Sequence, residues 1–574
     1  MTKISGGTVL IRALLDHDVD TIFTLCGNHL LSTYDAVLDA TSGAPWAAGR
    51  TPRLIDVRHE GAAAHMADAW YRVTGRPGVC LVTGGPGHTN ALTGIATAYA
   101  ADSPVIWLSG ASEAANQGMG AMQELDQVGI AQPVTKWSAE VTDLRRLPAA
   151  LDRAFQVAVT GRPGPVHLSL PVDMLDSVIE EADVRFPRPV DLRAATRMAG
   201  SPELIERALA ILADAEHPAI IAGAGAFASN AGDAIRRLCQ AANLPVFTID
   251  TARGIVSDDD PHCFGYADPV LNPVAALLGK ADAILVLGRR LDFRLRYGGI
   301  FHPACELVEV SADPTGFGRD PRSKMAIQGD IATVVDQLVG AAPRFPAKDP
   351  DIRRTWFHEL ETFERAGTEA RACDEDNEST PLHPRRIVRE IRDVLAEDYC
   401  LTFDAGDFVQ WARQGLPARR PGSWLRLGPM ATLGCALPFA IAAKLARPSA
   451  QVIALTGDGG LGFYGFELDT AVRHNLPIVV VVANDAGWGM ERNLQRGIYG
   501  EDRVTAADLR PTRYNEVMTA FGGYGEHVSA PAELGPALKR AIASGRPALL
   551  DVATASLPST LTLASVRRKL ERRE

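Results

Sequence analysis

The sequence predicts an α/β protein built from three doubly wound parallel-sheet domains, with a C-terminal tail or lid. Its 574 residues exceed what one hydrophobic core organises. Short apolar segments repeatedly end at glycine-rich turns, and helix-forming segments follow them. Strands that alternate with helices in this way form parallel sheets covered on both faces. We place the domains at 1–190, 200–342 and 381–555, and the tail or lid at 556–574.

The composition is that of a globular chain. Hydrophobic residues make up 46% and charged residues 22% of the sequence. The net charge of −11 argues against general binding to nucleic acid or to an anionic membrane. The eight cysteines include no C-x-x-C pair, and no leader peptide or long apolar run is present. We therefore expect a cytoplasmic protein with reduced thiols and no membrane span.

In the first domain, predicted strands and helices alternate along the chain. The strands are expected at 21–25, 53–57, 79–83, 105–109 and 166–170. Glu60 lies just beyond the second strand and is followed by Gly61 and several alanines. Its carboxylate is therefore expected to face a cleft at the sheet edge. The alternative is a first-turn glutamate that the helix dipole favours.

The middle domain is expected to be Rossmann-like, between two linkers at 183–199 and 344–380. Its first strand ends in a Gly-x-Gly turn at Gly223 and Gly225, which lacks the rest of a nucleotide fingerprint. In the second linker the acidic run at 374–378 is expected to be solvated.

The third domain carries the pattern that organises the chain. An apolar strand at 452–455 leads to the turn 457–460, a helix is expected at 466–473, and a second strand ends at Asn484. Two parallel strands of one sheet end at the same edge, so Asp458 and Asn484 are expected side by side. Oxygen ligands suit Mg²⁺, and the glycines allow backbone N–H groups to approach a diphosphate. The alternative is a structural Asp/Asn turn in an ordinary α/β domain.

This pattern resembles the metal–diphosphate signature of thiamine diphosphate (ThDP) enzymes. Segments 58–61, 75–79, 85–87 and 93–99 resemble the pyrimidine-binding domain of the acetolactate synthase superfamily. The resemblance implies ThDP and Mg²⁺ as cofactors, and it leaves open whether ADP occupies the middle domain.

Individual residues receive roles from the resemblance. Glu60 matches the glutamate that hydrogen-bonds the aminopyrimidine N1′ and so activates the cofactor. The expected metal ligands are Asp458, Asn484 and the backbone carbonyl of Ala486. Leu433 matches the residue that supports the bent form of ThDP, with a plain core position as its alternative. The other expected cofactor contacts are Pro86, Gly406, Asp407, Phe408, Gly457, Asp458, Gly459, Gly460, Asn484, Gly487 and Trp488.

The reaction is inferred from three segments. Segments 119–127, 461–470 and 488–493 resemble oxalyl-CoA decarboxylases and 2-hydroxyacyl-CoA lyases, most of all the actinobacterial lyases. They imply a carbon–carbon lyase that reversibly cleaves a small 2-hydroxyacyl-CoA, such as 2-hydroxyisobutyryl-CoA, to formyl-CoA and a ketone or aldehyde. The alternatives are an oxalyl-CoA decarboxylase or acetolactate synthase-like carboligase, and a catalytically silent ThDP-fold subunit.

Glu491 is the second expected catalytic residue, since the matching lyase residue takes the substrate hydroxyl proton and returns it after cleavage. Its alternative is a solvated glutamate beside Arg492, with Gln495 one turn on. The CoA phosphates require cations, for which Arg253 and Arg413 are candidates unless they form surface salt bridges. The expected substrate contacts are Asn28, His29, Gln123, Leu125, Arg253, Arg413 and Met490.

Three residues or pairs depart from the family pattern, namely His88, Asp407-Phe408 and Asp485. The first is expected to reshape the pocket beside ThDP, and the others weaken assignments of single phosphate contacts. The C-terminal segment is either a lid or a frayed basic tail. In the family the pyrimidine and diphosphate sites lie on different subunits, so we expect a homotetramer. The expected substrate is an acyl-CoA.

Overall fold

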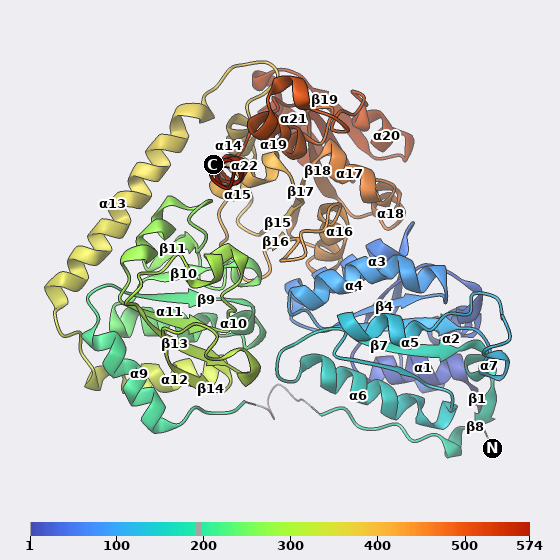
Figure 1. The fold of residues 1–574 in the computed structure, drawn as a ribbon. Helices are drawn as coiled ribbons and strands as arrows, with labels where there is room; N and C mark the ends of the chain where they lie inside the picture. Colours follow the sequence, from blue (N-terminus) through green and yellow to red (C-terminus); the bar gives the residue numbers. More distant parts are fainter. Residues whose placement is uncertain (1, 191–196, 574) are drawn as a thin grey trace. The chain divides into compact units, whose positions relative to one another are not determined.

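The computed structural model describes residues 2–190 and 197–573 (Figure 1). It contains three six-stranded sheets, and every strand pair within them is parallel. The strand orders are β3-β2-β4-β5-β7-β6, β11-β10-β9-β12-β13-β14 and β16-β15-β17-β18-β20-β19. The predicted fold class is thus confirmed.

The first sheet is covered on both faces, with α3 and α4 on one side and α1 and α6 on the other (Figure 1). The buried strands are almost continuously apolar, as parallel strands between two helix layers require. Its strands are β2 (Thr21–Thr24), β3 (Arg53–Asp56), β4 (Gly78–Val82), β5 (Val105–Ala111), β6 (Trp137–Glu140) and β7 (Val166–Pro171). Its helices are α1 (Gly6–Asp16), α2 (Leu31–Thr41), α3 (Glu60–Thr74), α4 (Pro86–Ala100), α5 (Gln127–Ala131), α6 (Leu147–Val159) and α7 (Val172–Asp176). A small antiparallel pair, β1 (Lys3–Ser5) with β8 (Val178–Glu180), lies outside this sheet.

The second sheet forms the middle domain. Its strands are β9 (Pro218–Ala222), β10 (Val246–Thr248), β11 (Cys263–Tyr266), β12 (Ala283–Leu287), β13 (Glu306–Ser311) and β14 (Ser323–Gln328). Its helices are α9 (Pro202–Asp214), α10 (Ala224–Ala228), α11 (Gly232–Ala242) and α12 (Ile331–Ala341). Part of the expected first linker, 191–196, lies outside the described residues.

The third sheet carries the Asp458 and Asn484 pattern. Its strands are β15 (Tyr399–Phe403), β16 (Trp424–Arg426), β17 (Gln451–Gly457), β18 (Ile478–Asn484), β19 (Tyr524–Val528) and β20 (Ala548–Ala553). The helices of this part of the chain are α14 (Pro384–Asp393), α15 (Asp407–Gly415), α16 (Ala436–Ala446), α17 (Asp458–Tyr464), α18 (Glu467–Arg473), α19 (Gly489–Tyr499), α20 (Tyr514–Ala520), α21 (Pro531–Ala543) and α22 (Thr560–Glu571).

The chain divides into two compact units, each with its own packing. The first unit holds residues 1–195 together with 427–447 and 464–476. The second unit holds 196–426, 448–463 and 477–574. The exact boundaries of the three domains stay predictions.

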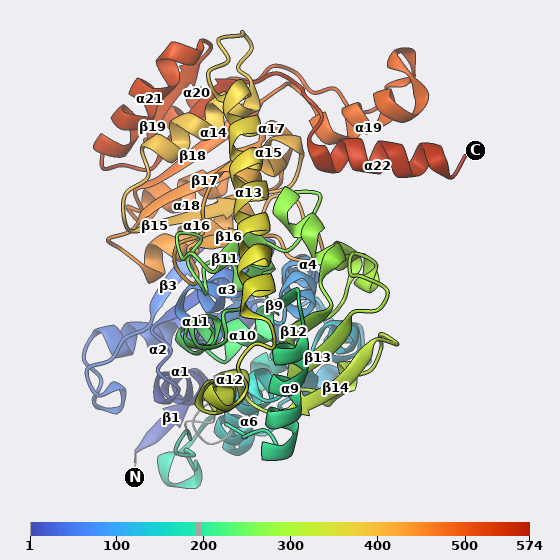
Figure 2. The same ribbon diagram turned by 90° about the vertical axis from the view of Figure 1, so that its left-hand side faces the viewer.

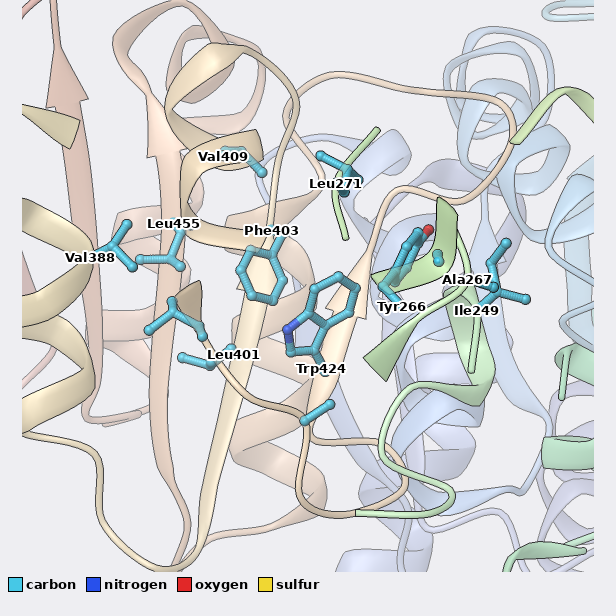
Figure 3. Close-up of a cluster of buried hydrophobic side chains, with 14 of the residues drawn as sticks. Ile249, Tyr266, Ala267, Leu271, Val388, Leu401, Phe403, Val409, Trp424 and Leu455 are labelled. Carbon is cyan, nitrogen blue, oxygen red and sulfur yellow. The ribbon is translucent and has the colours of Figure 1, made fainter. Parts of the chain in front are cut away.

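The second unit has a core shared by the middle and third sheets. Trp424 packs 4.4 Å from Phe403 and 6.0 Å from Tyr266, measured between ring centroids (Figure 3). Leu401 and Leu455 extend the same cluster into β15 and β17. Burial of these large side chains stabilises the junction between the two sheets.

Most of the expected second linker, 344–380, is the helix α13 (Pro350–Glu375), which the sequence analysis did not predict. Asp349 caps this helix, and Trp356 packs into the middle domain with its Nε1 donating to the Pro218 carbonyl. The few buried positions of α13 make its amphipathic pattern weak, which explains why the helix was not predicted.

The acidic run 374–378 is largely exposed, as expected, and arginines of α14 also pair with it. Glu375 pairs with Arg392 at 2.6 Å, and Asp374 pairs with Arg385 at 3.4 Å. Two further pairs join Asp376 to Arg389 and Glu378 to Arg386. The run is therefore an ion-pair surface between two helices.

Within the part of the chain that the structure describes, no helix combines the length and apolar character needed to cross a bilayer.

Candidate active site

Asp458 and Asn484 lie at the same edge of the third sheet, as expected from their strands. β17 and β18 are parallel neighbours in which Gly457 pairs with Ala483. Asp458 follows β17 directly and Asn484 is the last residue of β18. The local form differs from the expected glycine turn, because α17 begins at Asp458 itself.

Hydrogen bonds fix both side chains at this edge. Gly487 N donates to Asp458 Oδ2 at 2.9 Å, and Ala486 N donates to Asn484 Oδ1 at 3.1 Å. The Asn484 amide group donates to Asp551 Oδ1 at 2.9 Å, which turns its oxygen away from that carboxylate. Each side chain thus presents an oxygen that is already positioned.

The electrostatics of this edge fit a bound cation. Asp458 is 1% exposed, and its pKa is raised by burial and by the neighbouring carboxylate of Asp485. The nearest cation to Asp485 is the Arg492 guanidinium, at 3.6 Å. The buried carboxylate of Asp458 and the partly buried one of Asp485 destabilise each other unless a cation joins them. Mg²⁺ prefers such oxygen donors.

The third expected metal ligand, the carbonyl of Ala486, is occupied in this structure. It accepts hydrogen bonds from Leu509 N and from Arg492 Nη2, both at 2.9 Å. Ala486 has a left-handed φ of 52°, which is uncommon for a residue with a Cβ. Coordination by this carbonyl requires Arg492 to release it, so its role stays a prediction.

The glycines of the G-D-G-G segment allow close packing. A Cβ on Gly459 would lie 2.7 Å from the Trp488 ring, and one on Gly460 would lie 3.0 Å from the Asp404 carboxyl carbon. Gly406 takes a φ of 95° between β15 and α15, so the backbone turns sharply there. These contacts hold the ends of β15, β17 and β18 close together.

Asp407 and Phe408 are committed to protein contacts. Asp407 Oδ1 accepts from Ser559 N at 2.9 Å and from the Thr562 hydroxyl at 2.5 Å, while Oδ2 accepts from Asn493 Nδ2 at 2.9 Å. Phe408 is buried in the shared core. Any diphosphate contact by these two residues therefore falls to their backbone, and Asp407 instead connects α15, α19 and α22.

Glu60 lies in the first unit, as the first residue of α3. It is 7% exposed, and its Oε2 accepts from Asn90 Nδ2 at 3.0 Å. Pro86 begins α4, and a Cβ on Gly87 would lie 3.4 Å from Glu60 Oε1. The sequence reasoning missed Asn90, whose signal was its place four residues after Pro86 in the helix behind the G-P-G turn.

The expected substrate loop lines a cavity in the first unit. The cavity has a volume of about 370 Å³, and Gln123, Leu125 and Gln127 are among its lining residues. Gln127 Oε1 accepts from Gly85 N at 3.1 Å, and a Cβ on Gly85 would lie 2.8 Å from Gln123 Cβ. The loop is thus held against the turn that leads into α4.

The other expected contacts of the first unit lie near the same turn. His29 is buried, and its Nδ1 is 3.1 Å from the Thr83 hydroxyl, while Asn28 is exposed. Leu433 is half-buried, and the neighbouring Thr432 hydroxyl is 2.7 Å from that of Thr97 in α4.

His88 points away from the turn, contrary to the idea that it reshapes a pocket there. Its ring stacks on Trp107 at 4.1 Å, and its Nδ1 is 3.0 Å from the Ser109 hydroxyl. Burial lowers its pKa to about 4, so it is a neutral core residue.

Glu491 lies in the first turn of α19, next to Met490. Its side chain is exposed and has no hydrogen-bond or ion-pair partner among residues 2–190 and 197–573. The alternative was a solvated glutamate that interacts with Arg492 and Gln495. Both residues have other partners, since Arg492 binds Asp508 and Gln495 binds the backbone of Thr505. Glu491 is therefore free to contact a ligand.

α22 lies alongside α19 in the second unit (Figure 2). A Cβ on Gly497 would lie 2.7 Å from the Val566 side chain, so the glycine permits this close approach. The start of α22 is tied to α15 by the Gln414 and Thr560 side chains, 2.7 Å apart. The C-terminal segment is a docked helix, and its action as a lid stays a prediction.

Arg253 and Arg413 are both buried. Arg253 forms a bidentate pair with Asp258. Arg413 donates to Gln410 Oε1 at 2.6 Å, but its Nε and Nη2 have no hydrogen-bond partner within residues 2–190 and 197–573. Its pKa is lowered to about 9 by burial and by the positive charge of Arg426. Arg413 is thus a buried cation without a carboxylate in the described parts of the chain.

The Gly-x-Gly turn of the middle domain does not open a nucleotide site. A Cβ on Gly223 would lie 2.7 Å from Arg289 Cβ, and one on Gly225 would lie 2.8 Å from Gly288 Cα. Both glycines therefore serve the packing of β9 against the end of β12, and the turn gives no support for ADP.

Comparisons with known proteins agree with this geometry. Three family models match, namely the N-terminal TPP binding domain of thiamine pyrophosphate enzymes at residues 4–130, their central domain at 205–338 and their C-terminal TPP binding domain at 404–552.

Similar full-length proteins point the same way. A probable acetolactate synthase of Mycobacterium bovis is 37% identical over 96% of this chain and 95% of its own. The acetolactate synthase isozyme 3 large subunit of Escherichia coli is 32% identical over 94% and 93%. The 2-hydroxyacyl-CoA lyase 1 of Mus musculus is 29% identical over 96% and 94%. The chain therefore belongs to the thiamine diphosphate enzyme family that includes the acetolactate synthases.

Proposed function

We propose that the protein is a Mg²⁺-dependent ThDP enzyme that forms or breaks a carbon–carbon bond beside a carbonyl, and that it acts as a carboligase of the acetolactate synthase type. The observation that carries this proposal is the near full-length similarity to acetolactate synthases. The lyase expected from the sequence becomes the second candidate, because the relatives favour its alternative.

We propose a separate role for each of the expected site residues. Bound ThDP supplies a nucleophilic carbon and an electron sink. To Glu60, which is buried at the start of α3, we assign proton exchange with the aminopyrimidine N1′. Asp458 and Asn484 would hold Mg²⁺ through their side-chain oxygens, and the ion would supply positive charge to balance a diphosphate. We assign the acyl group of the substrate to the cavity that Gln123 and Leu125 line.

Two observations favour a 2-hydroxyacyl-CoA lyase as the second candidate. Among the described residues, the exposed Glu491 side chain at the start of α19 has no partner. It is therefore available to take the proton of a substrate hydroxyl and return it to the new formyl carbon. Arg413 is a buried cation with two nitrogens that lack a partner among the described residues, and a CoA phosphate is the anion that we propose for it. The mouse relative is consistent with this chemistry.

A comparison of substrates separates the candidates. The purified protein is incubated with ThDP and Mg²⁺, and with pyruvate, 2-hydroxyisobutyryl-CoA or oxalyl-CoA in parallel. Acetolactate from pyruvate supports the carboligase. Acetone with formyl-CoA supports the lyase, and formyl-CoA with carbon dioxide from oxalyl-CoA identifies a decarboxylase. Each activity should vanish in Glu60→Ala, and failure of the wild-type protein to bind ThDP would contradict all three.

A further inference from the structure

A second buried glutamate lies behind Glu60 in the first unit. Glu467, the first residue of α18, is 1% exposed. Its Oε1 accepts from Arg58 N at 3.0 Å and from His59 N at 3.1 Å. Its Oε2 accepts from the Thr470 hydroxyl at 2.6 Å. The carboxylate thus binds the two backbone N–H groups that directly precede Glu60.

These N–H groups belong to the corner between β3 and α3. β3 ends at Asp56 and α3 begins at Glu60, so residues 57–59 alone set where the Glu60 side chain emerges. On the other side of the corner, His59 Nδ1 accepts from Gly61 N at 3.0 Å. With Glu467 and this cap in place, the backbone on both sides of Glu60 is fixed.

The rest of the segment closes over the same corner. The Tyr464 hydroxyl occupies the space that a Cβ on Gly61 would need, and the rings of Tyr464 and His59 are 5.5 Å apart. A buried carboxylate is costly unless it accepts strong hydrogen bonds. An ordinary helix-docking contact does not need one, so the binding of two successive backbone N–H groups by one buried side chain points to a requirement for exact placement.

We propose that Glu467 is a positioning residue, which orients Glu60 for activation of ThDP by binding the backbone N–H groups of Arg58 and His59. This inference rests on the proposed function, because it assigns Glu60 to the cofactor. Glu467 acts through the backbone of the corner and does not itself touch the reacting atoms.

The test measures cofactor activation directly, as the rate of hydrogen–deuterium exchange at C2 of bound ThDP. In Glu467→Ala the rate should fall at least about tenfold, while ThDP affinity changes less than about threefold. Glu467→Gln keeps an acceptor oxygen and should recover most of the rate. Amide exchange of a peptide covering 54–62 should rise in Glu467→Ala without any cofactor.

The matched control is Asp469→Ala on the same helix. Asp469 pairs with the Arg58 side chain at 3.1 Å and leaves the backbone N–H groups alone, so this variant should exchange C2 at the wild-type rate. Equal loss in Asp469→Ala would reduce Glu467 to a docking contact and overturn the inference. An equal loss of the C2 exchange rate in Glu467→Gln would show that the charge of Glu467 causes the effect, and it would also overturn the inference.

A second variant and the wild-type protein distinguish the remaining outcomes. If Glu467→Ala does not fold, Thr470→Val decides. This variant removes the Thr470 hydrogen bond and leaves Oε2 only the longer one from Arg58 N, at 3.3 Å, so it should slow C2 exchange about two- to fivefold. An unchanged rate in Thr470→Val then contradicts the inference. If the wild-type protein shows no C2 exchange, the proposed function has failed, whereas wild-type exchange with an equally fast Glu467→Ala variant contradicts only the role of Glu467.

Discussion

At the scale of residues, Glu60 depends on a partner that lies thirty positions along the chain. Asn90 Nδ2 provides a neutral donor to Oε2, so it orients the carboxylate without neutralising it. Asn90→Ala should lower kcat about tenfold with little change in KM, because a misdirected general base slows proton transfer. Steady-state kinetics measure this. Thr89→Ala, one residue earlier, serves as control, and an equal loss there would contradict the prediction.

Substitution of Arg413 tests whether the second unit binds an anionic ligand. Burial of an unpaired cation costs several kcal/mol, whereas its contacts with the Tyr266 and Trp424 rings contribute about 0.5–2 kcal/mol. Arg413→Leu should therefore leave the ligand-free protein equally or more stable in urea unfolding. The same variant should lose CoA binding in calorimetry if CoA is the ligand.

The control for this prediction is Arg419→Leu, which removes a half-exposed arginine paired with Asp259. A destabilised Arg413→Leu variant that still binds CoA like the wild type would show that Arg413 has only a structural role.

Glu467 gives the first unit a defined pH dependence. Burial raises its pKa to about 7 in the folded protein, against 4.5 as its ordinary value. Between these values the folded state holds a proton that the unfolded state has released, so stability falls as pH rises from about 5 to about 8. This group contributes about 1–3 kcal/mol to that fall.

Urea unfolding of the cofactor-free protein at pH 5.5 and pH 8 measures the effect. Glu467→Gln cannot titrate, so its stability should change less between the two pH values than that of the wild type. An identical pH dependence in both proteins would show that other groups cause it.

The site residues that could be predicted from the sequence are those that belong to a local pattern of strands and turns. Asp458 and Asn484 follow two apolar strands, so their convergence needs only the rule that parallel strands end together. Glu467 was out of reach, because its partners Arg58 and His59 lie about four hundred positions away and offer only backbone atoms. Asp407 was expected to contact the diphosphate of the cofactor. Its carboxylate binds three protein groups, which no local sequence pattern reveals.

At the scale of elements, the strands were easier to predict than the helices that join the domains. Apolar runs located β4, β12, β17 and β18 because a parallel strand is buried on both faces. α13 was taken for a linker, since most of its length faces solvent and its composition is charged. Its start was nevertheless encoded, by Asp349 as the cap and Pro350 in the first turn.

α22 offers a prediction at this scale. Asp407 holds the start of α22 and the side chain of Asn493 in α19, so Asp407→Ala removes three hydrogen bonds at a buried point. The variant should lose about 1–3 kcal/mol of stability and show faster amide exchange in 556–571 and in α19. Asp502→Ala, at an exposed position in the loop after α19, is the control. Unchanged exchange in 556–571 would show that packing of Val566 on Gly497 holds the helix by itself.

At the scale of the whole molecule, the expected catalytic groups lie in different units of the chain. Glu60 belongs to the first unit, whereas Asp458 and Asn484 belong to the second. We propose a homotetramer in which each active site takes its pyrimidine half from one subunit and its diphosphate half from another. Light scattering after gel filtration measures the assembly, and a monomer that is active at all concentrations would contradict it.

Complementation tests the shared site itself. Chains with Glu60→Ala and chains with Asp458→Ala are each expected to be inactive. When both are co-expressed, half of the dimers pair unlike chains, and each such dimer holds one intact and one doubly altered site. About a quarter of the wild-type activity should therefore return. Co-expression of Asp458→Ala with Asn484→Ala places both defects in the same half, so it should recover nothing. If the first pair also recovers nothing although mixed dimers are isolated through two different tags, each site is complete within one chain.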